Sequence, residues 1–513
     1  MDQLTSQLAN AHILNQLWLT FLIVISMVLV SRTFVAGTRY SPILIIVVFG
    51  LLMGFILVQT GIASPGLPEF PVIDLGSKVT ITALIASFFV GGQELRKIIT
   101  KHAINKDELI IPSNEEMFLG TKSTQFMFLI RSFFILIGIE SLKRTIIGHN
   151  TGDVLDHFYP ILGYLGIVAS IILIDFKAQI ARKSHYIQKG ILETAVILTI
   201  LVASFYSAQW IKPFIALPEI FFAMIISVAT GMIFSNWHFG PTIRSLLFAG
   251  IPVVLASNFM VGGSRIADAF TLEGMTSVLS FGFFGQLMWM FGGLALLILF
   301  GKANSIRNLA PGMAGSLSHS GLTGACTAGD FGLEAAVRAP IMINIPFAGH
   351  IFVFSILASS VESGSLNLFW SSLVVLAGII FTVFSLKLLR KANEQESAEI
   401  KGLMLFSLGW QLTAVFGGFL IMTLSGMSLA DSVMANSSAI SHFGLFAAIQ
   451  GGMFGSHAAG MIAFVFAMPF LVHPFVFWIF GKTMENNDRM PIRIVFTLAI
   501  IGVLGVLYAL FIS

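Results

Sequence analysis

Charge and cysteine are both scarce in this sequence of 513 residues. Only 10% of the residues are Asp, Glu, Lys or Arg, and the formal net charge is +3. No polybasic tail or basic patch occurs, so we expect no nucleic-acid partner. Cys326 is the single cysteine, which excludes an intramolecular disulfide framework and any Cys-based zinc or iron–sulfur site.

Familiar catalytic motifs are missing as well. The sequence has no Gly-x-Ser-x-Gly elbow, no His-Glu-x-x-His pair and no phosphate-binding Gly-rich loop with a Lys. These absences argue against a membrane protease and against a nucleotide-driven pump. We therefore expect no enzyme and no cofactor other than a coupling ion. The first residues, MDQLTSQLANAHILNQ, lack the charged start and cleavage site of a signal peptide, so the first apolar run should remain as a helix.

Apolar residues dominate instead. They make up 56% of the chain, mean hydropathy is +0.91, and apolar runs of about twenty residues recur from end to end. A β-barrel would alternate apolar and polar residues in short segments. The fold class predicted is an all-α polytopic membrane protein with a single transmembrane domain over 1–513. We expect spans near 13–35, 43–62, 79–99, 124–140, 154–175, 189–211, 217–235, 245–263, 277–300, 338–361, 366–389, 402–424, 458–480 and 491–512.

Two segments, near 309–332 and 433–456, are long but too rich in Gly and Ser for ordinary spans. We expect both to be broken or re-entrant, which membranes allow only where the backbone is shielded by protein or lines a wet cavity. Lys and Arg concentrate in alternate loops if these segments return to the side they enter from. That layout gives fourteen crossings with both termini outside.

The broken segments belong to an internal repeat. Aligning 318–356 with 441–479 gives 17 identities in 39 positions, including Ser318/Ser441 and His319/His442. QLMWMFGG at 286–293 echoes QLTAVFGG at 411–418, so we place the repeated units at 280–361 and 405–482. A weaker pair, 42–99 and 218–265, shares ASFFVGG and ASNFMVGG. An odd number of crossings separates each pair, which predicts inverted repeats of the secondary-transporter type.

The broken segments supply most candidate binding residues, because Ser, Thr and His side chains with exposed carbonyls can ligate a solute or an ion in a dry surrounding. Asp330 and Glu334, with Arg338 one turn on, form either a coupling carboxylate with its counter-charge or a solvated loop end. His350 and His473 follow a proline by four residues in each unit and read as structural histidines of kinked helices or as a proton-sensitive pair. The candidate substrate- or ion-binding residues are Ser318, His319, Ser320, Thr323, Thr327, Asp330, Ser441, His442, Gln450 and His457.

Several of these stretches resemble bacterial sodium/glutamate symporters. They are LPEIFFAMIISVATGMIFSN at 217–236, LAPGMAGSLSHSGLTGACTAGDFG at 309–332 and IPFAGHIFVFSILA at 345–358, about a third of the chain. The core SHSGLTGACTA matches the family's Gly-rich broken segment best at His319, Gly321, Gly324 and Thr327. The resemblance implies a sodium-coupled carboxylate transporter on an inverted-repeat plan.

The function expected is therefore a sodium-coupled symporter of a small anionic solute, such as a carboxylate or an amino acid like glutamate. Proton coupling remains open, and the sequence names no ligands for a sodium ion. The main alternative is a cation/proton antiporter, and a channel is a further one because re-entrant segments also build filters. We expect a multi-pass protein of the bacterial inner membrane, in contact with lipid; a homodimer is one assembly that the sequence leaves open.

Overall fold

The computed structural model describes most of the chain, in stretches separated by short gaps. These stretches are 42–67, 69–70, 80–99, 122–148, 180–214, 217–237, 251–267, 274–327, 331–392, 395–450, 452–485 and 490–511, with single positions near 23–31 and 242–246. The predicted span at 154–175 and almost all of the one at 13–35 lie outside the described residues, as does Asp330.

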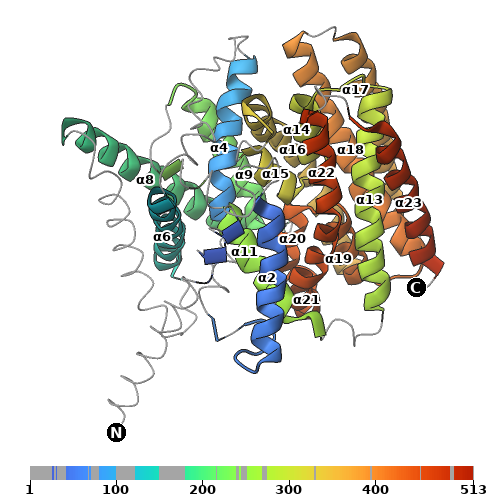
Figure 1. Cartoon of the computed structure of the whole chain (residues 1–513), viewed down its shortest axis with the longest axis horizontal. Coiled ribbons are helices and arrows are strands. Elements are labelled where there is room, and N and C mark those ends of the chain that lie inside the picture. Colours follow the sequence, from blue (N-terminus) through green and yellow to red (C-terminus); the bar gives the residue numbers. More distant parts are fainter. Residues whose placement is uncertain are drawn as a thin grey trace.

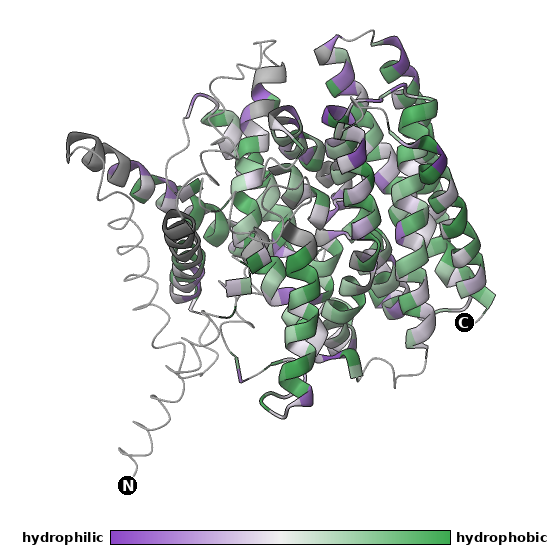
Figure 2. Cartoon of the chain, in the orientation of Figure 1, coloured by the Kyte–Doolittle hydropathy of each residue, from purple (hydrophilic) through white to green (hydrophobic). Residues whose placement is uncertain are grey.

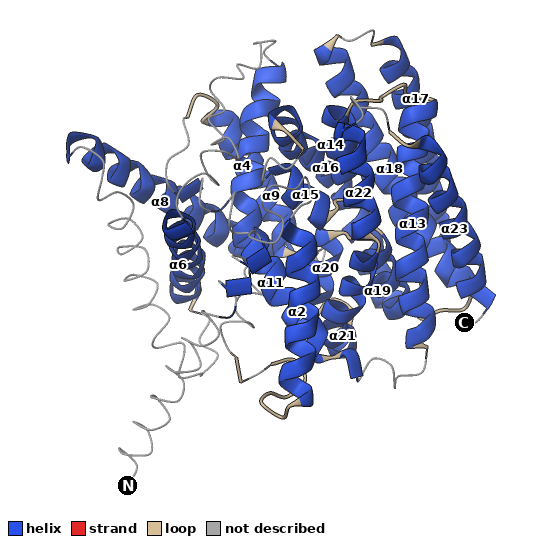
Figure 3. Ribbon diagram, in the orientation of Figure 1, coloured by secondary structure: helices blue, strands red, loops and turns tan. Residues whose placement is uncertain are grey.

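Helices account for all the regular structure among the described residues (Figure 3). Five of them, beginning at residues 188, 275, 368, 397 and 492, are long and apolar enough to cross a membrane. Hydrophobic residues make up most of the length of outer helices such as α2, α13 and α23 (Figure 2). The prediction of an all-α membrane protein is confirmed. The helices are α2 (Pro42–Gln59), α4 (Thr80–Ile99), α6 (Lys122–Ile147), α8 (Ile180–Ile211), α9 (Glu219–Ile233), α11 (Ile251–Ser264), α13 (Met275–Leu299), α14 (Ile306–Ser316), α15 (Ser320–Thr327), α16 (Leu333–Ser363), α17 (Leu368–Lys391), α18 (Glu396–Leu424), α19 (Leu429–Ala439), α20 (Phe443–Gln450), α21 (Gly455–Ala467), the 3₁₀ helix η2 (Met468–Leu471), α22 (His473–Glu485) and α23 (Ile492–Phe511).

The second half of the chain forms two sets of helices, α13–α17 and α18–α23, which pack on each other. α13 packs along α23, although they begin one set and end the other, and α17 packs along α18. Figure 1 shows these four helices together on one side, with α14–α16 and α19–α22 between them and the first-half helices. The contacts of α13 with α23 and of α17 with α18 therefore join the two sets over long apolar surfaces.

The short helices of the two sets match in position along the chain. α19 begins and ends 123 residues after α14, and α20 begins and ends 123 residues after α15. The break before each second helix contains a serine with positive φ, 47° at Ser318 and 53° at Ser441. Each pair of helices is therefore a hairpin whose sharp turn is set by one residue in the left-handed region.

The hairpin α14–α15 enters and leaves at one end of the molecule. Arg307, at the start of α14, forms an ion pair with Glu334, at the start of α16. Since α16 begins a few residues after α15 ends, α15 returns toward the end from which α14 came. The segment is therefore a hairpin whose two ends lie at the same end of the molecule.

The predicted single helix at 458–480 is wrong in one respect. The corresponding helix of the first set, α16, is continuous over 31 residues despite Pro340 and Pro346. The second set divides into α21, η2 and α22. It carries Pro474 where the first has Ile351, in addition to Pro469. The two prolines, five residues apart, each remove a backbone donor and together interrupt the α-helical ladder.

Close glycine contacts join the helices of the first half. A Cβ at Gly54 of α2 would lie 1.9 Å from the carbonyl oxygen of Met260 on α11, and one at Gly231 of α9 would lie 2.0 Å from that of Phe89 on α4. The two contacts are equivalent, because α2 resembles α9 in sequence and α4 resembles α11. Such approach is the usual way helices pack in membranes, where small residues let backbones meet.

Candidate functional site

The turns of the two hairpins meet inside the second half of the chain. His319 and His442 face each other through an antiparallel backbone bridge. Both residues are 0% exposed, and the serine before each is 3% exposed or less. The backbones of the two turns therefore run in opposite directions where they meet. We call the bridge and its surrounding side chains the crossing.

Each crossing histidine is oriented by its own helix. Nδ1 of His319 accepts a hydrogen bond from the amide of Leu322 at 3.1 Å, and Nδ1 of His442 accepts one from Leu445 at the same distance. These bonds use one of the first amides of α15 and α20, which have no partner within the helix. An accepting Nδ1 in a neutral imidazole places the ring proton on Nε2.

Two glutamines from the long helices face these Nε2 atoms. The side-chain nitrogen of Gln286 on α13 lies 2.7 Å from Nε2 of His319, and that of Gln411 on α18 lies 2.6 Å from Nε2 of His442. Since Nε2 carries the proton, the ring-facing end of each amide must be its oxygen, and the opposite end its NH₂ group. As assigned, with oxygen at the opposite end, neither glutamine accepts a hydrogen bond there. The crossing therefore contains two buried amide ends that a bound group could meet.

Histidines from the opposite set complete the crossing. The ring of His350, on α16, lies 4.6 Å from that of His442, and the ring of His473, on α22, lies 4.6 Å from that of His319. Nε2 of His350 is 2.9 Å from Nε2 of His442. Each half of the crossing thus combines a turn from one set with a histidine from the other.

The structural interpretation of His350 and His473 also has support. Nδ1 of His350 lies 3.1 Å from the carbonyl oxygen of Pro346, and Nδ1 of His473 lies 3.2 Å from that of Pro469. In each case Nδ1–H donates to the carbonyl of a proline four residues earlier, which leaves Nε2 as an acceptor directed at the crossing. The two readings of these histidines are therefore compatible.

Glycine is required where these rings cover the short helices. A Cβ at Gly321 of α15 would lie 2.6 Å from Nε2 of His473, and one at Gly444 of α20 would lie 3.2 Å from Nε2 of His350. Both glycines belong to the first turn of an eight-residue helix. An accepting nitrogen thus occupies the positive end of each short helix.

One hydroxyl at the crossing has no protein partner. Oγ of Ser441 is buried and makes no hydrogen bond. The equivalent Ser318 accepts a hydrogen bond from Gln411 at 3.0 Å as the atoms are assigned, or donates to it with the amide reversed. A buried hydroxyl without a partner costs about 1–3 kcal/mol, which a bound group could offset.

The structure brings some of the sequence-predicted candidates together and separates others. Thr323 is buried one turn into α15, Gln450 is half-buried at the end of α20, and His457 is exposed on α21. Ser320 and Thr327 are the first and last residues of α15. Those gathered at the crossing are Ser318, His319, Ser441 and His442.

Sequence reasoning missed Gln286 and Gln411. Both are the first residue of a repeated motif, QLMWMFGG and QLTAVFGG. The motif indicates the repeat, but its spacing does not mark the glutamine as a site residue. An amide kept at the same position of two otherwise diverged apolar helices was the signal available. Which histidine it would face could not be read from the sequence, because the contact crosses between helices far apart in the chain.

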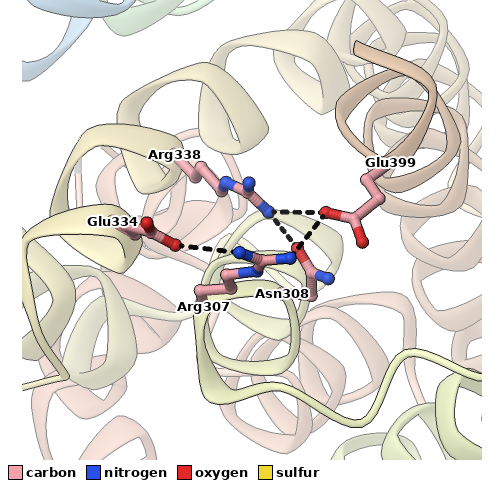
Figure 4. Close-up of polar contacts among 5 residues, drawn as sticks. All are labelled: Arg307, Asn308, Glu334, Arg338 and Glu399. Carbon is pink, nitrogen blue, oxygen red and sulfur yellow. Dashed lines mark hydrogen bonds and ion pairs between the residues drawn. The ribbon is translucent and has the colours of Figure 1, made fainter. Parts of the chain in front are cut away.

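Glu334 and Arg338 are placed at one end of the hairpin rather than at the crossing. Arg338 is 2% exposed and bonds the side-chain oxygen of Asn308 on α14. Its guanidinium also lies 3.4 Å from a carboxylate oxygen of Glu399 on α18. Figure 4 shows these residues with Arg307 converging from three helices. Neither of the two alternatives for this charged group, a coupling carboxylate or a solvated loop end, foresaw an ion-pair network.

No family model, no curated protein and no solved structure matches this chain. The function is therefore proposed from the chemistry of the crossing and from the sequence resemblance.

Proposed function

We propose that this chain is a secondary active transporter that binds a small anionic solute at the crossing and moves it by alternating access. Sodium-coupled symport of a carboxylate or an amino acid such as glutamate is the form favoured by the sequence resemblance, in a bacterial inner membrane. The observation that carries the proposal is the antiparallel meeting of two hairpin turns at His319 and His442, deep in the helical bundle. Inverted repeats with interrupted helices at the midplane are the plan of many secondary transporters.

The donors at the crossing support an anion rather than a bare cation as the solute. The hydroxyl of Ser441 is a buried donor without a partner. In the tautomer described above, the NH₂ groups of Gln286 and Gln411 point away from the histidine rings and add two buried donors. The first turns of α15 and α20 add the positive ends of two short helices. A carboxylate could accept from these groups if the rings of His350 and His473 moved aside.

A second candidate, a cation/proton antiporter, has one specific observation in its favour. His350 and His442 approach through their Nε2 atoms at 2.9 Å, an arrangement in which two imidazoles can share a proton. In that case the four histidines would carry protons and no organic anion would bind. The same histidines would serve proton-coupled symport, so only the binding of an anion separates the two functions.

Ligand-dependent thermal unfolding of the detergent-solubilised protein tests the proposal. A ligand that binds only the folded state raises the unfolding temperature by mass action, by a few degrees at about 100 times its dissociation constant. The panel comprises dicarboxylates, amino acids and small inorganic anions, each with sodium or with potassium. We expect one class of anion to stabilise the protein, more strongly with sodium.

Two histidine variants provide the contrast. His319→Ala should abolish the shift, because it removes the ring that Gln286 and the first turn of α15 are built around. His457→Ala, which changes an exposed histidine on α21, should retain it. Two results would show that the crossing is not the anion site. One is equal stabilisation of both variants by the anion, and the other is no stabilisation of the wild-type protein by any anion.

A further inference from the structure

The charged residues at the outer end of the first hairpin form a network between the two sets of helices. Arg307 and Arg338 come from α14 and α16, which belong to the first set, and Glu399 comes from α18, which belongs to the second. Glu399 lies 3.5 Å from Arg307 and 3.4 Å from Arg338 (Figure 4). Glu399 is thus the residue of this group that spans the two sets.

Two further contacts of the network lie within the first set. Arg307 pairs with Glu334 at 3.4 Å, and Arg338 bonds Asn308. Among these contacts two guanidinium groups face two carboxylates. If the sets separated, Glu399 would leave, Arg307 would keep the contact with Glu334, and Arg338 would keep the contact with the neutral Asn308. Opening therefore breaks both ion pairs of Glu399 and leaves the buried Arg338 without that carboxylate, a cost that holds the network closed.

The second hairpin does not repeat these charged residues at its own outer end. At the positions 123 residues after Arg307, Glu334 and Arg338 stand Ala430, His457 and Met461. His457 is exposed, and Met461 is buried among apolar side chains. The two ends therefore differ in their chemistry, because the two arginines and the glutamate of the first hairpin have no arginine or carboxylate at the equivalent positions of the second.

We infer that Glu399 and its two arginines form an ionic latch that closes one entrance to the crossing and must break for the site to open on that side. The inference rests on the proposed function for its role in transport, but the latch itself can be tested without a substrate. Glu399 acts on the helices and does not touch the solute. Because Lys and Arg gather in the loops at this end, the latch is expected to face the cytoplasm.

The single cysteine of the chain is the reporter for the test. Cys326 is 0% exposed in α15, the helix that runs from the crossing back toward the latch. A membrane-impermeant maleimide would be applied to right-side-out and to inside-out vesicles that contain the full chain, and the rate of Cys326 modification measured. Wild-type protein should react slowly from either side.

The latch is opened by the double variant Arg338→Met with Glu399→Gln. Met is the residue that the second set carries at the position equivalent to Arg338, and the pair of changes leaves no unmatched buried charge. We expect modification of Cys326 to accelerate about tenfold or more in inside-out vesicles only. The reason is that the variant raises the population of the state open on that side, and the maleimide reacts only with that state. Glu399→Gln alone should give the same direction with a smaller change.

Controls separate the latch from a general loss of structure. Glu219→Gln weakens another partly buried ion pair, that between Glu219 and Lys143 at 2.5 Å, and should leave the rate unchanged. Unfolding would expose Cys326 from both sides, whereas an open entrance exposes it from one. An unchanged rate in the well-folded double variant, or an equal rise from both sides, overturns the latch. A one-sided rise in a protein that binds no anion upholds the latch and rejects the anion as solute.

Discussion

At the scale of single residues, the crossing depends on side chains and backbone conformations that an ordinary helix would not tolerate. Ser318 and Ser441 both have positive φ, which costs a non-glycine residue about 1–2 kcal/mol. A strained serine kept at two equivalent turns suggests that its hydroxyl is needed there. Two explanations can be tested separately: the cost of the positive φ, and the need for the serine hydroxyl.

Substitution of Ser441 distinguishes the two explanations. Ser441→Gly should raise the unfolding temperature relative to Ser441→Ala, by the equivalent of about 1 kcal/mol, because only glycine adopts this φ freely. Both variants lack the hydroxyl, so both should weaken the anion-dependent thermal shift. Equal unfolding temperatures for the two variants would contradict the conformational explanation, and an unaltered anion shift would contradict the chemical one.

Gly321 is the position where the approach of a histidine ring leaves no room for a side chain. Gly321→Ala would force Nε2 of His473 away from its present place, 2.6 Å from the new Cβ. Overpacking of this kind costs about 1–3 kcal/mol, and we expect transport to fall about tenfold or more. Gly292→Ala, where the nearest atom would be 3.8 Å away on Trp410, is the matched control and should be nearly neutral. A neutral Gly321→Ala would mean that the ring of His473 is not held over α15.

At the scale of helices, most elements could be predicted from apolar runs and breakers. The hydropathy pattern predicted α2, α4, α9, α13, α17 and α23 within a few residues, because each is a continuous apolar stretch. The division between α21 and α22 was missed, since apolar composition runs through it and only Pro474 marks the break. The Gly-rich segments were predicted to be broken, and each contains a helix, a turn at a serine and a second helix.

The glycine contacts between helices of the first half give a prediction about stability. Gly54→Ala and Gly231→Ala should each lower the unfolding temperature by the equivalent of about 3 kcal/mol, because the added Cβ would meet a backbone oxygen that cannot rotate away. The two effects should be similar in size, since the contacts are equivalent. Gly460→Ala, whose nearest neighbour would be a side-chain atom 3.6 Å away, is the control. A marked difference between Gly54→Ala and Gly231→Ala would argue against equivalent packing of the two helix pairs.

At the scale of the whole molecule, sequence reasoning identified the hairpin turns but not how they combine. The identities between 318–356 and 441–479 pointed to two related turns, and to His319 and His442 within them. Other features depend on contacts between residues about 60–90 positions or more apart in the chain. They are the contacts of His350 and His473 with the histidine of the other set, and the ion pair of Glu399 with Arg338. Periodicity and spacing describe the chain locally, so they carry no information on which distant helix a side chain meets.

The direction in which the helices cross the membrane can be tested by labelling. The latch end is expected in the cytoplasm because Lys and Arg gather in its loops. Lys391 ends α17 and Ser365 precedes it, so a cysteine at each should lie on opposite sides of the membrane. With Cys326 replaced by alanine, Lys391→Cys should react with an impermeant maleimide from the cytoplasmic side, where Lys and Arg gather, and Ser365→Cys from outside. Reaction of both from the same side would show that α17 does not cross.

The most direct measurement is the current produced by the purified protein in proteoliposomes on a solid-supported membrane. Sodium jumps and pH jumps would be applied with and without each anion of the panel, to wild-type protein, to His319→Ala and to His457→Ala. We predict a saturable current that requires both a coupling ion and one class of anion, that is lost in His319→Ala and that is kept in His457→Ala. A current driven by opposed sodium and pH gradients, indifferent to every anion, would contradict anion symport and identify a cation/proton antiporter.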